Sequence, residues 1–459
     1  MIRFLAGLAL IAAPAAGPSA FGFDIPAAPG HRPGPLDAGS PGVGPAGLVC
    51  LRDGSSLVRL RPGERPERLD LTALARTAIA RDVMRTGDWD ERWDMSLMVD
   101  TTIQFDARGT AFTLLIPRYS NLKRAVLLWS RDGCRSWRAA PLASRAATME
   151  KAGAFTDRAG PPTIVSYETH GGYTGKRLWL DLFRWQGDAL VRRAAPLLAA
   201  DDSLLTGNHS GGGNSTWTGQ GRIVLVYPAA TAGKQGALIV SRELDLRTLA
   251  WAAPAAPVGR STTAGANDNH DLPAIARLPS GRLITVVGAH HAQFRLFESR
   301  KAGTTLSGWG APQPVGDPAR GGAFAEYSYT SLNVARDGTI NIVARAEGRG
   351  GHYDLVQLRR RPNGSWLWPD GQPHRLIAAP KRHAYAAWRQ RVSEAPDGTL
   401  YLFFSYFPNR LSPVEATAMK VARSGARDCT QPDGRCWYPD VPTFATRTLV
   451  SHDAGATWE

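Results

Sequence analysis

Seven patterns of the same kind follow one another along the chain. In each, two apolar runs flank a short turn that contains glycine, which is typical of two adjacent antiparallel strands. A single such unit cannot bury both faces of its sheet, whereas a ring of units can. The repeat therefore predicts an all-β, seven-bladed β-propeller forming one domain, residues 46–459. The turn glycines are 51 to 61 residues apart and are Gly54, Gly109, Gly160, Gly221, Gly281, Gly338 and Gly398.

A second turn motif occurs twice. Residues 451–458 read SHDAGATW and match S-x-D-x-G-x-T-W in full, and residues 130–137 read SRDGCRSW, with Cys134 in place of the glycine. The motif resembles the Asp-box, or BNR, repeat of sialidase-like propellers. Its carboxylate can accept N–H groups of its own turn while the Trp packs under neighbouring strands. We therefore expect structural roles, and no catalytic role, for Asp132, Trp137, Asp453 and Trp458.

The first 45 residues differ in composition from the rest of the chain. Residues 1–20 contain an early cation, Arg3, an apolar stretch and small residues around Ala13, which predicts a signal peptide and a secreted or periplasmic protein. No apolar stretch is long enough to predict a membrane anchor. Residues 21–45 are rich in Pro and Gly. We expect them to form an arm that closes the last blade.

Export to an oxidising compartment favours disulfides among the four cysteines. Three connectivities are compatible with four cysteines. Cys429 and Cys436 bracket a short polar loop, TQPDGR, which favours a local disulfide and would leave Cys50 with Cys134. No pair of cysteines has the spacing of a zinc site.

The chain is strongly basic, with 54 Lys and Arg against 40 Asp and Glu, a formal charge of +14 and a pI near 10.0. A nucleic-acid partner is not indicated, because no basic run or nucleic-acid-binding motif accompanies the charge. A positive field instead concentrates a polyanion, which favours an anionic extracellular polysaccharide as partner. We expect a monomer that does not bind a membrane. A coding bias towards Arg explains the charge equally well.

The fifth hairpin pattern brings histidines together. If Leu278 lies opposite Leu283 across the turn, then His270 lies opposite His291 and beside His290. Both ends lie away from the turn, at the face of a propeller where each first strand begins and each second strand ends. Imidazoles titrate near neutral pH and serve as acids or bases.

The sixth hairpin pattern brings a phenol and a guanidinium to the same face. If Ala335 lies opposite Ile340, then Arg345 lies opposite Thr330 and next to Tyr329. Four such groups at matching ends of neighbouring strands predict a functional site. Other residues expected near this face could contact a substrate, and they are His209, His291, Tyr327, His383, Tyr385 and Arg389.

The sequence segments around these residues resemble those of a known family. NDNHDLPA, GAHHAQFRLFES and YSYTSL, within residues 267–404, are similar to the BNR-repeat polysaccharide lyases, the seven-bladed ulvan lyases and rhamnose–glucuronate lyases. The resemblance implies that His270, His290, Tyr329 and Arg345 form an active site. Ser299, which closes the second strand, fits His290 better than His291 as the family's histidine. One departure is Asp271, where the family's motif has Asn.

These residue types suit β-elimination from a uronic acid. Arg345 can grip a carboxylate with two hydrogen bonds and neutralise it. His270 or His290 can act as base or acid, and Tyr329 can carry the second proton. The sequence leaves open which group takes the proton and which returns it. No cofactor is required, and a structural calcium ion is compatible with the sequence but not indicated by it.

Two other classes share the expected fold. A sialidase would use a tyrosine and a glutamate, such as Tyr327 and Glu326, but its Arg-Ile-Pro signature is present only as residues 116–118 in the wrong order, IPR. A rhamnose-releasing hydrolase on the lyase-like scaffold stays open as an alternative. A non-catalytic propeller would bind glycans on the same face through aromatic residues. Formation of an unsaturated uronic acid distinguishes the lyase from both.

Overall fold

The protein is all-β throughout the part of the chain that the structure describes. This computed structural model describes residues 34–53, 56–71, 73, 102–115, 125–144, 146–150, 158–167, 176–204, 214–229, 238–260, 273–288, 294–316, 324–348, 353–364, 366, 368–378, 387–406 and 445–459. Two short 3-10 helices, η1 (Pro35–Ala38) and η2 (Pro45–Gly47), accompany the strands. No described helix is long and apolar enough to cross a bilayer. The predicted signal peptide lies outside the described residues.

The first half of the chain forms three sheets and a hairpin, all antiparallel. The β1–β4 sheet contains β1 (Ser40–Val43), β2 (Val49–Asp53), β3 (Ser56–Leu60) and β4 (Glu67–Asp70). The β5–β8 sheet contains β5 (Gln104–Phe105), β6 (Ala111–Leu115), β7 (Val126–Ser130) and β8 (Arg138–Pro141). The β9–β18 sheet contains β9 (Ala146–Met149), β10 (Ile164–Tyr167), β11 (Lys176–Asp181), β14 (Leu197–Ser203), β15 (Ser215–Trp217), β16 (Arg222–Ala229), β17 (Leu238–Asp245) and β18 (Ala256–Arg260). The hairpin is β12 (Phe183–Gln186) with β13 (Ala189–Arg192).

The second half forms three more antiparallel sheets. The β19–β23 sheet contains β19 (Ala274–Arg277), β20 (Leu283–Val287), β21 (Phe294–Lys301), β22 (Thr304–Trp309) and β23 (Gln313–Val315). The β24–β27 sheet contains β24 (Phe324–Val334), β25 (Ile340–Gly348), β26 (Tyr353–Arg360) and β27 (Arg375–Ala378). The β28–β30 sheet contains β28 (Ala387–Glu394), β29 (Leu400–Tyr406) and β30 (Ala445–Ser451).

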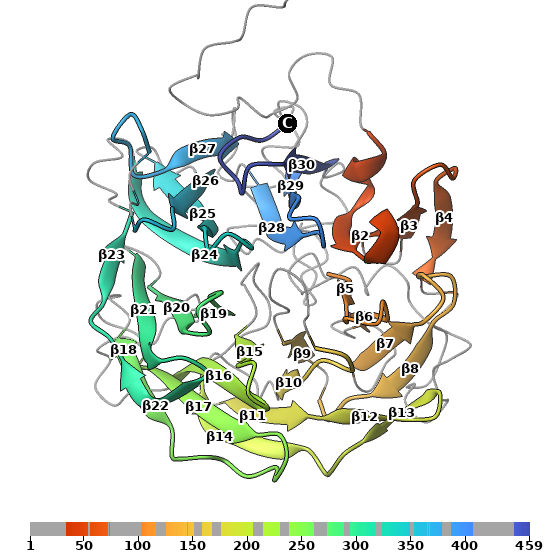
Figure 1. Ribbon diagram of the computed structural model, residues 1–459, viewed down its shortest axis with the longest axis horizontal. Helices are drawn as coiled ribbons and strands as arrows, with labels where there is room; N and C mark the ends of the chain where they lie inside the picture. The colour runs from red at the N-terminus through yellow and green to blue at the C-terminus, as the bar shows by residue number, and fades with distance from the viewer. Residues whose placement is uncertain are drawn as a thin grey trace, which may run out of the picture.

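The sheets follow one another around a ring, and Figure 1 shows their first strands at its centre. Contacts run from β15 to β19, β19 to β24 and β24 to β28, and β28 contacts β1, which in turn contacts β5. The last sheet therefore meets the first, and the ring is closed. The predicted all-β class is confirmed, and the arrangement is β-propeller-like. The β9–β18 sheet joins two four-stranded halves through a single pair, Ser203 with Ala229.

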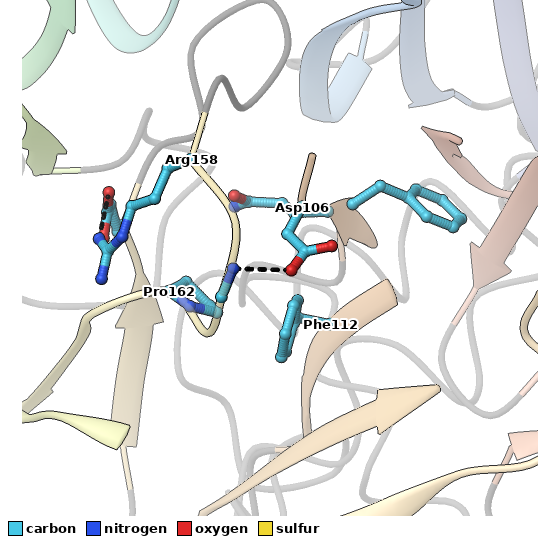
Figure 2. Close-up of a pocket in the computed structure, with 8 residues that line it drawn as sticks. Asp106, Phe112, Arg158 and Pro162 are labelled. Atoms are coloured by element: carbon cyan, nitrogen blue, oxygen red, sulfur yellow. Dashed lines mark hydrogen bonds and ion pairs between the residues drawn. The ribbon is translucent and has the colours of Figure 1, made fainter. Parts of the chain in front are cut away.

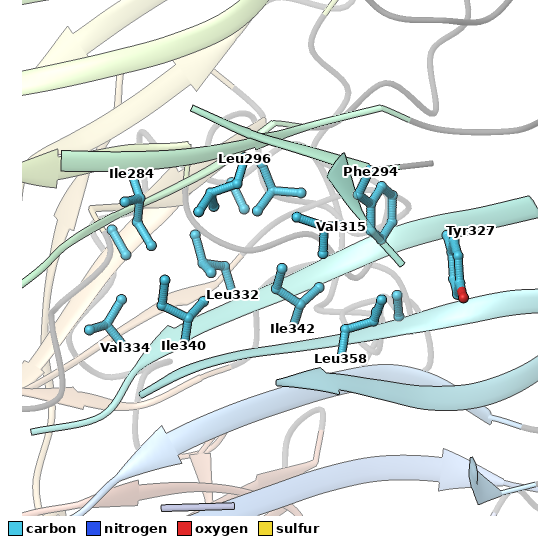
Figure 3. Packing of buried hydrophobic residues seen from close by; sticks show 14 of the residues in the cluster. Ile284, Phe294, Leu296, Val315, Tyr327, Leu332, Val334, Ile340, Ile342 and Leu358 are labelled. Atoms are coloured by element: carbon cyan, nitrogen blue, oxygen red, sulfur yellow. The ribbon is translucent and has the colours of Figure 1, made fainter. Parts of the chain in front are cut away.

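The core lies between neighbouring sheets. Figure 3 shows Leu296 and Val315 of the β19–β23 sheet facing Leu332 and Ile342 of the β24–β27 sheet. Because sheets cover β25 from both sides, its side chains from Ile340 to Ala346 are all buried, including the polar side chains of Asn341 and Arg345. Full burial of each large aliphatic side chain contributes about 1.5–3 kcal/mol.

The registers of the two central hairpins differ by one residue from the prediction. Arg277, not Leu278, lies opposite Leu283. Leu278 instead begins a five-residue turn, in which its N–H donates to the Arg282 carbonyl and it accepts from Gly281. Gly281 has φ +81°, so the left-handed glycine adds one residue to the turn.

The β24–β25 hairpin repeats this turn. Val334, not Ala335, lies opposite Ile340, and the Ala335 N–H donates to the Thr339 carbonyl. Gly338, with φ +87°, is the left-handed residue. This turn moves the observed register by one residue from the predicted one. At the other end of the hairpin, a bulge in β24 moves it by one residue more.

In both Asp-box motifs the carboxylate accepts hydrogen bonds from its own turn. Asp132 accepts hydrogen bonds from the Arg135 and Ser136 N–H groups, at 3.1 and 2.9 Å, and from two serine hydroxyls. Asp453 accepts in the same way from the N–H and hydroxyl of Thr457, at 2.9 and 2.7 Å. These bonds hold the pKa of both carboxyl groups below the ordinary value despite partial burial. Trp137 and Trp458 are buried against the neighbouring sheet.

The Asp-boxes also receive arginines that the sequence reading did not single out. Arg59 of β3 donates Nε–H to the Gly133 carbonyl at 2.8 Å, and Arg359 of β26 donates Nε–H to the Ala454 carbonyl at 3.2 Å. Gly133 and Ala454 occupy the same position of the motif. Each Asp-box is therefore bonded to the third strand of the preceding sheet by an equivalent guanidinium.

Cys50 of β2 and Cys134 of the first Asp-box form a disulfide, with the two Cα atoms 6.7 Å apart. It links the β1–β4 and β5–β8 sheets. Cys134 has φ +70°, and Gly455, its counterpart in the second Asp-box, has φ +84°. The motif's glycine thus marks a left-handed position that cysteine occupies here at a conformational cost. The predicted Cys429–Cys436 bond lies outside the described residues.

The described part of the N-terminal arm lies beside the last sheet, and residues 21–33 lie outside the described residues. Residues 40–43 form β1, which starts the first sheet. Asp37 of η1 accepts the Thr448 N–H of β30 at 2.8 Å. Glu459 pairs with Val450 farther along the same edge. Asp37 and Glu459 therefore bond the backbone groups of β30 through which a further strand would pair with it.

Candidate functional site

Tyr329 and Arg345 lie in contact at the end of the β24–β25 hairpin away from its turn. The Arg345 guanidinium carbon lies 3.6 Å from the centroid of the Tyr329 ring. Arg345 faces Ser328 across the hairpin, rather than Thr330 as its register predicts from the sequence. The register shifts between Ser328 and Ser331, so β24 bulges at Tyr329.

The bulge gives Tyr329 an unusual backbone conformation. Its φ is +58°, in the left-handed region that a tyrosine rarely adopts. Such conformations cost about 1–3 kcal/mol and persist where surrounding contacts hold them. One such contact comes from the next sheet, because Gln390 of β28 donates Nε2–H to the Tyr329 carbonyl at 2.6 Å.

Arg345 is largely shielded from solvent, with an exposed fraction of 8%. The planar fork of a guanidinium can bind a carboxylate through two hydrogen bonds. Electrostatic interactions are stronger here than in water because the surrounding dielectric constant is lower. The cation also lies on the electron-rich face of a phenol. This part of the site can therefore combine a carboxylate grip with a proton carrier.

Most other residues of the predicted site lie outside the part that the structure describes. They are His209, His270, His290, His291, His383 and Tyr385. The backbone of Arg389 lies in β28, but its side chain is not described. The pairing of two histidines with Tyr329 and Arg345 accordingly stays a prediction.

Tyr327 occupies a position that does not suit its predicted contact with substrate. Its side chain has no exposed surface and packs in the core against Phe294. Its hydroxyl lies 2.6 Å from His374 Nδ1. Burial lowers the pKa of His374 to about 4, so the imidazole is neutral at physiological pH. Its Nδ1 can then accept a hydrogen bond from the Tyr327 hydroxyl. Regular strand alternation would place Tyr327 and Tyr329 on the same face, and the bulge and positive φ at Tyr329 break this alternation.

A pocket on the turn side of the ring is lined by Asp106, Glu150 and Arg158 (Figure 2). The non-protein space at this pocket amounts to about 290 Å³, open solvent at its mouth included. Asp106 accepts N–H groups of Thr110 and Gly160, at 2.8 and 2.7 Å. Gly160 belongs to the next sheet's turn, so this carboxylate joins two sheets.

The second carboxylate of this pocket is also engaged. Glu150 accepts Arg158 Nη1–H through both oxygens, at 3.2 and 2.8 Å, and the Thr163 N–H at 2.8 Å. These bonds brace the chain between β9 and β10. The described residues contain no group of three or more His, Cys, Asp or Glu side chains that could hold a metal ion.

Glu394, at the turn end of β28, is buried and titrates unusually. Burial raises its pKa from 4.5 to about 7, although the Arg336 N–H donates to it at 3.1 Å and the Arg336 charge opposes the shift. Asn333 also stabilises the ionised form, and Asp337 destabilises it. The carboxyl group therefore takes up a proton near neutral pH on the face away from Tyr329.

We expect Glu394→Gln to raise stability relative to the natural protein as pH increases. A folded pKa above the unfolded value means that this group's stabilising contribution is complete below about pH 4.5 and is lost as pH rises through about 7. Glutamine mimics the protonated form, so its advantage should reach about 3 kcal/mol near pH 8 and become small below about pH 4.5. Urea unfolding at several pH values measures it.

Asp397→Asn is the matched control for this prediction. Asp397 lies in the turn that follows β28, and the Thr399 N–H lowers the pKa of its carboxyl group. Its stabilising contribution is present above the unfolded pKa, so Asp397→Asn should lose stability at neutral pH. An equal pH profile for Glu394→Gln and the natural protein would contradict the raised pKa.

Comparisons with known proteins give only weak similarities. No protein-family model matches the chain, and no curated protein matches it. The chain is similar to an α-L-arabinofuranosidase of Fusarium graminearum in complex with arabinobiose, at 10% identity and a TM-score of 0.41 over 70% of this chain and 91% of that one. It is similar to an α-L-arabinanase of Cellvibrio cellulosa in complex with arabinohexaose, at 15% identity and a TM-score of 0.33 over 68% and 93%.

A polysaccharide lyase is also among the similar structures. It is an ulvan lyase, similar at 14% identity and a TM-score of 0.30 over 41% of this chain and 43% of that one. TM-scores this low carry no argument about fold or activity. The site must therefore be interpreted from its own residues.

Proposed function

We propose that the protein is a secreted polysaccharide lyase, a seven-bladed propeller that cleaves a uronate-containing polymer by metal-independent β-elimination. The observation that carries the proposal is the contact between the Arg345 guanidinium and the Tyr329 ring, at 3.6 Å. It unites a permanent cation with a proton carrier, two of the three functions that the reaction needs. The sequence around His270 and His290, which resembles that of BNR-repeat lyases, supports the third.

In this mechanism Arg345 binds the carboxylate of the uronic acid. Neutralising that charge acidifies the proton on the adjacent carbon, C5, because negative charge that develops there can spread into the carboxylate. A base removes the proton, the electron pair forms the C4=C5 double bond, and the bond from C4 to the leaving oxygen breaks. An acid protonates that oxygen. Tyr329 and one of the histidines, His270 or His290, share these two proton transfers in either order.

The composition agrees with an anionic substrate. A net charge of +14 attracts a polyanion over a distance of about 8 Å at physiological ionic strength. Rhamnose–glucuronate polymers such as ulvan fit the charge and the resemblance. The enzyme would act as a monomer on an extracellular glycan, without nucleic acid or membrane partners.

A glycoside hydrolase is the second candidate. The pocket beside β5 holds two carboxylates, Asp106 and Glu150, the residue type that glycoside hydrolases use as acid and base. The bonds of both carboxylates to backbone N–H groups favour a structural role. Asp106→Asn with Glu150→Gln should therefore leave lyase activity intact if the protein folds, whereas the pair would be essential to a hydrolase that used this pocket.

An assay of the product tests the proposal. The purified protein is incubated with ulvan, glucuronan, gum arabic and gellan-type sphingans, and both ultraviolet absorbance and reducing ends are followed. A lyase produces an unsaturated uronate and raises both signals. New reducing ends without new absorbance would replace the proposal by the hydrolase, and retention on a substrate column without either signal would replace it by a glycan-binding propeller.

A further inference from the structure

Two neighbouring strands at the centre of the ring each carry a bulge, and a hydrogen bond joins the two bulges. In β24, Tyr329 and Thr330 together face a single residue of β25. In β28, Arg389 and Gln390 together face a single residue of β29. Gln390 Nε2–H donates to the Tyr329 carbonyl across the boundary between the sheets, at 2.6 Å. Bulges of this kind re-aim side chains, often beside functional sites.

Gln390 is a costly residue at this position. Its side chain has no exposed surface, and within the described part of the chain its Oε1 accepts no hydrogen bond. A buried amide that is only half satisfied lowers stability relative to an apolar residue of the same shape. Packing alone therefore does not account for a glutamine here, whereas its bond to Tyr329 does.

We propose that Gln390 is a positioning residue, which holds Tyr329 in the left-handed conformation and so keeps the phenol against Arg345. This rests on the proposed function, in which that phenol transfers a proton. Tyrosine at φ +58° is strained and tends to relax towards negative φ. Since the bond from Gln390 ends on the carbonyl of the strained residue itself, it opposes that relaxation directly. The side chain of Gln390 need not touch the substrate.

Gln357 provides the matched control. It too has no exposed surface and donates Nε2–H to a backbone carbonyl across the same boundary between sheets, that of Gly455 at 2.9 Å. Its bond ends on the second Asp-box instead of the bulge. Gln357→Ala should therefore lower stability without moving Tyr329, whereas Gln390→Ala should move Tyr329.

Fluorine NMR of protein labelled with 3-fluorotyrosine reports the position of the phenol without any assay. The Tyr329 resonance is the one that Tyr329→Phe removes. We expect Gln390→Ala to shift or broaden it and Gln357→Ala to leave it in place. An unchanged Tyr329 resonance in a folded Gln390→Ala protein would overturn the proposal.

The denaturant midpoint of unfolding measures the backbone strain at residue 329 and its dependence on Gln390. Glycine tolerates positive φ, so Tyr329→Gly should unfold at a higher denaturant concentration than Tyr329→Ala. In the Gln390→Ala background residue 329 can relax, and this advantage of glycine should shrink. Equal midpoints for the two substitutions in the natural background would refute the strain.

Kinetics complete the test if the natural protein proves to be a lyase. Gln390→Ala should lower kcat by at least about tenfold with a smaller change in KM, because a misplaced proton carrier affects the transition state more than substrate binding. Unchanged kcat together with a shifted resonance would overturn the positioning role. If the natural protein has no lyase activity, the proposed function fails, but the resonance and stability measurements still decide whether Gln390 positions Tyr329.

Discussion

Replacing Arg345 by alanine should lower kcat/KM on a uronate-containing polysaccharide by at least about a hundredfold. Removing one preorganised group that stabilises developing charge typically costs about a hundred- to a thousandfold in rate. Arg345 is expected to carry more than one such interaction, since its guanidinium can bind both carboxylate oxygens and it lies in a shielded environment at 8% exposure. The measurement is the initial rate of formation of unsaturated uronate.

Two further variants show whether the effect belongs to the site. Arg345→Lys keeps the charge but loses the planar fork, so it should recover only part of the activity. Arg359→Ala removes an arginine from the same sheet whose Nε–H donates to the Ala454 carbonyl of the Asp-box. It should lower stability and leave kcat/KM unchanged. If folded Arg345→Ala kept full activity, Arg345 would not act in the reaction, and the proposed mechanism would be wrong.

Local patterns in the sequence predict much of the fold. The hydrogen bonds of the Asp-box motif are made within a few residues, as between Asp453 and Thr457. Hairpins are also local, and the all-β class follows from them. The registers fail by one residue because Gly281 and Gly338 adopt positive φ within their turns, which lengthens the turn without changing its composition.

The geometry around Tyr329 could not be predicted in the same way. Nothing in the residue types of β24 marks a tyrosine with φ +58°, because tyrosine ordinarily favours an extended strand. The group that bonds it, Gln390, lies 61 residues away in a different sheet. Asp37 and Thr448, whose bond helps to close the ring, are 411 residues apart. Such contacts depend on how sheets pack against one another, which no local pattern encodes.

Removing the disulfide between the first two sheets should lower the stability of the protein strongly. The bond between Cys50 and Cys134 closes a chain segment with a sequence separation of 84, and loss of a native disulfide of this kind costs about 2–5 kcal/mol. Cys50→Ala with Cys134→Ala should therefore unfold at a clearly lower urea concentration than the natural protein. Arg59 still bonds the same Asp-box through Gly133, so the variant should fold.

A glycine variant separates the covalent bond from the backbone conformation that it requires. Cys50→Ala with Cys134→Gly also lacks the disulfide, but it restores the residue that the Asp-box motif has at this position, where φ is +70°. We expect it to be about 1 kcal/mol more stable than the Cys134→Ala counterpart, because alanine retains the strain and glycine does not. Equal stability of the two would exclude strain at Cys134, while natural stability in both would show that the bond contributes nothing. The expected order, with the natural protein first and the alanine variant last, would mean that the disulfide more than offsets the cost of placing a cysteine in a glycine's conformation.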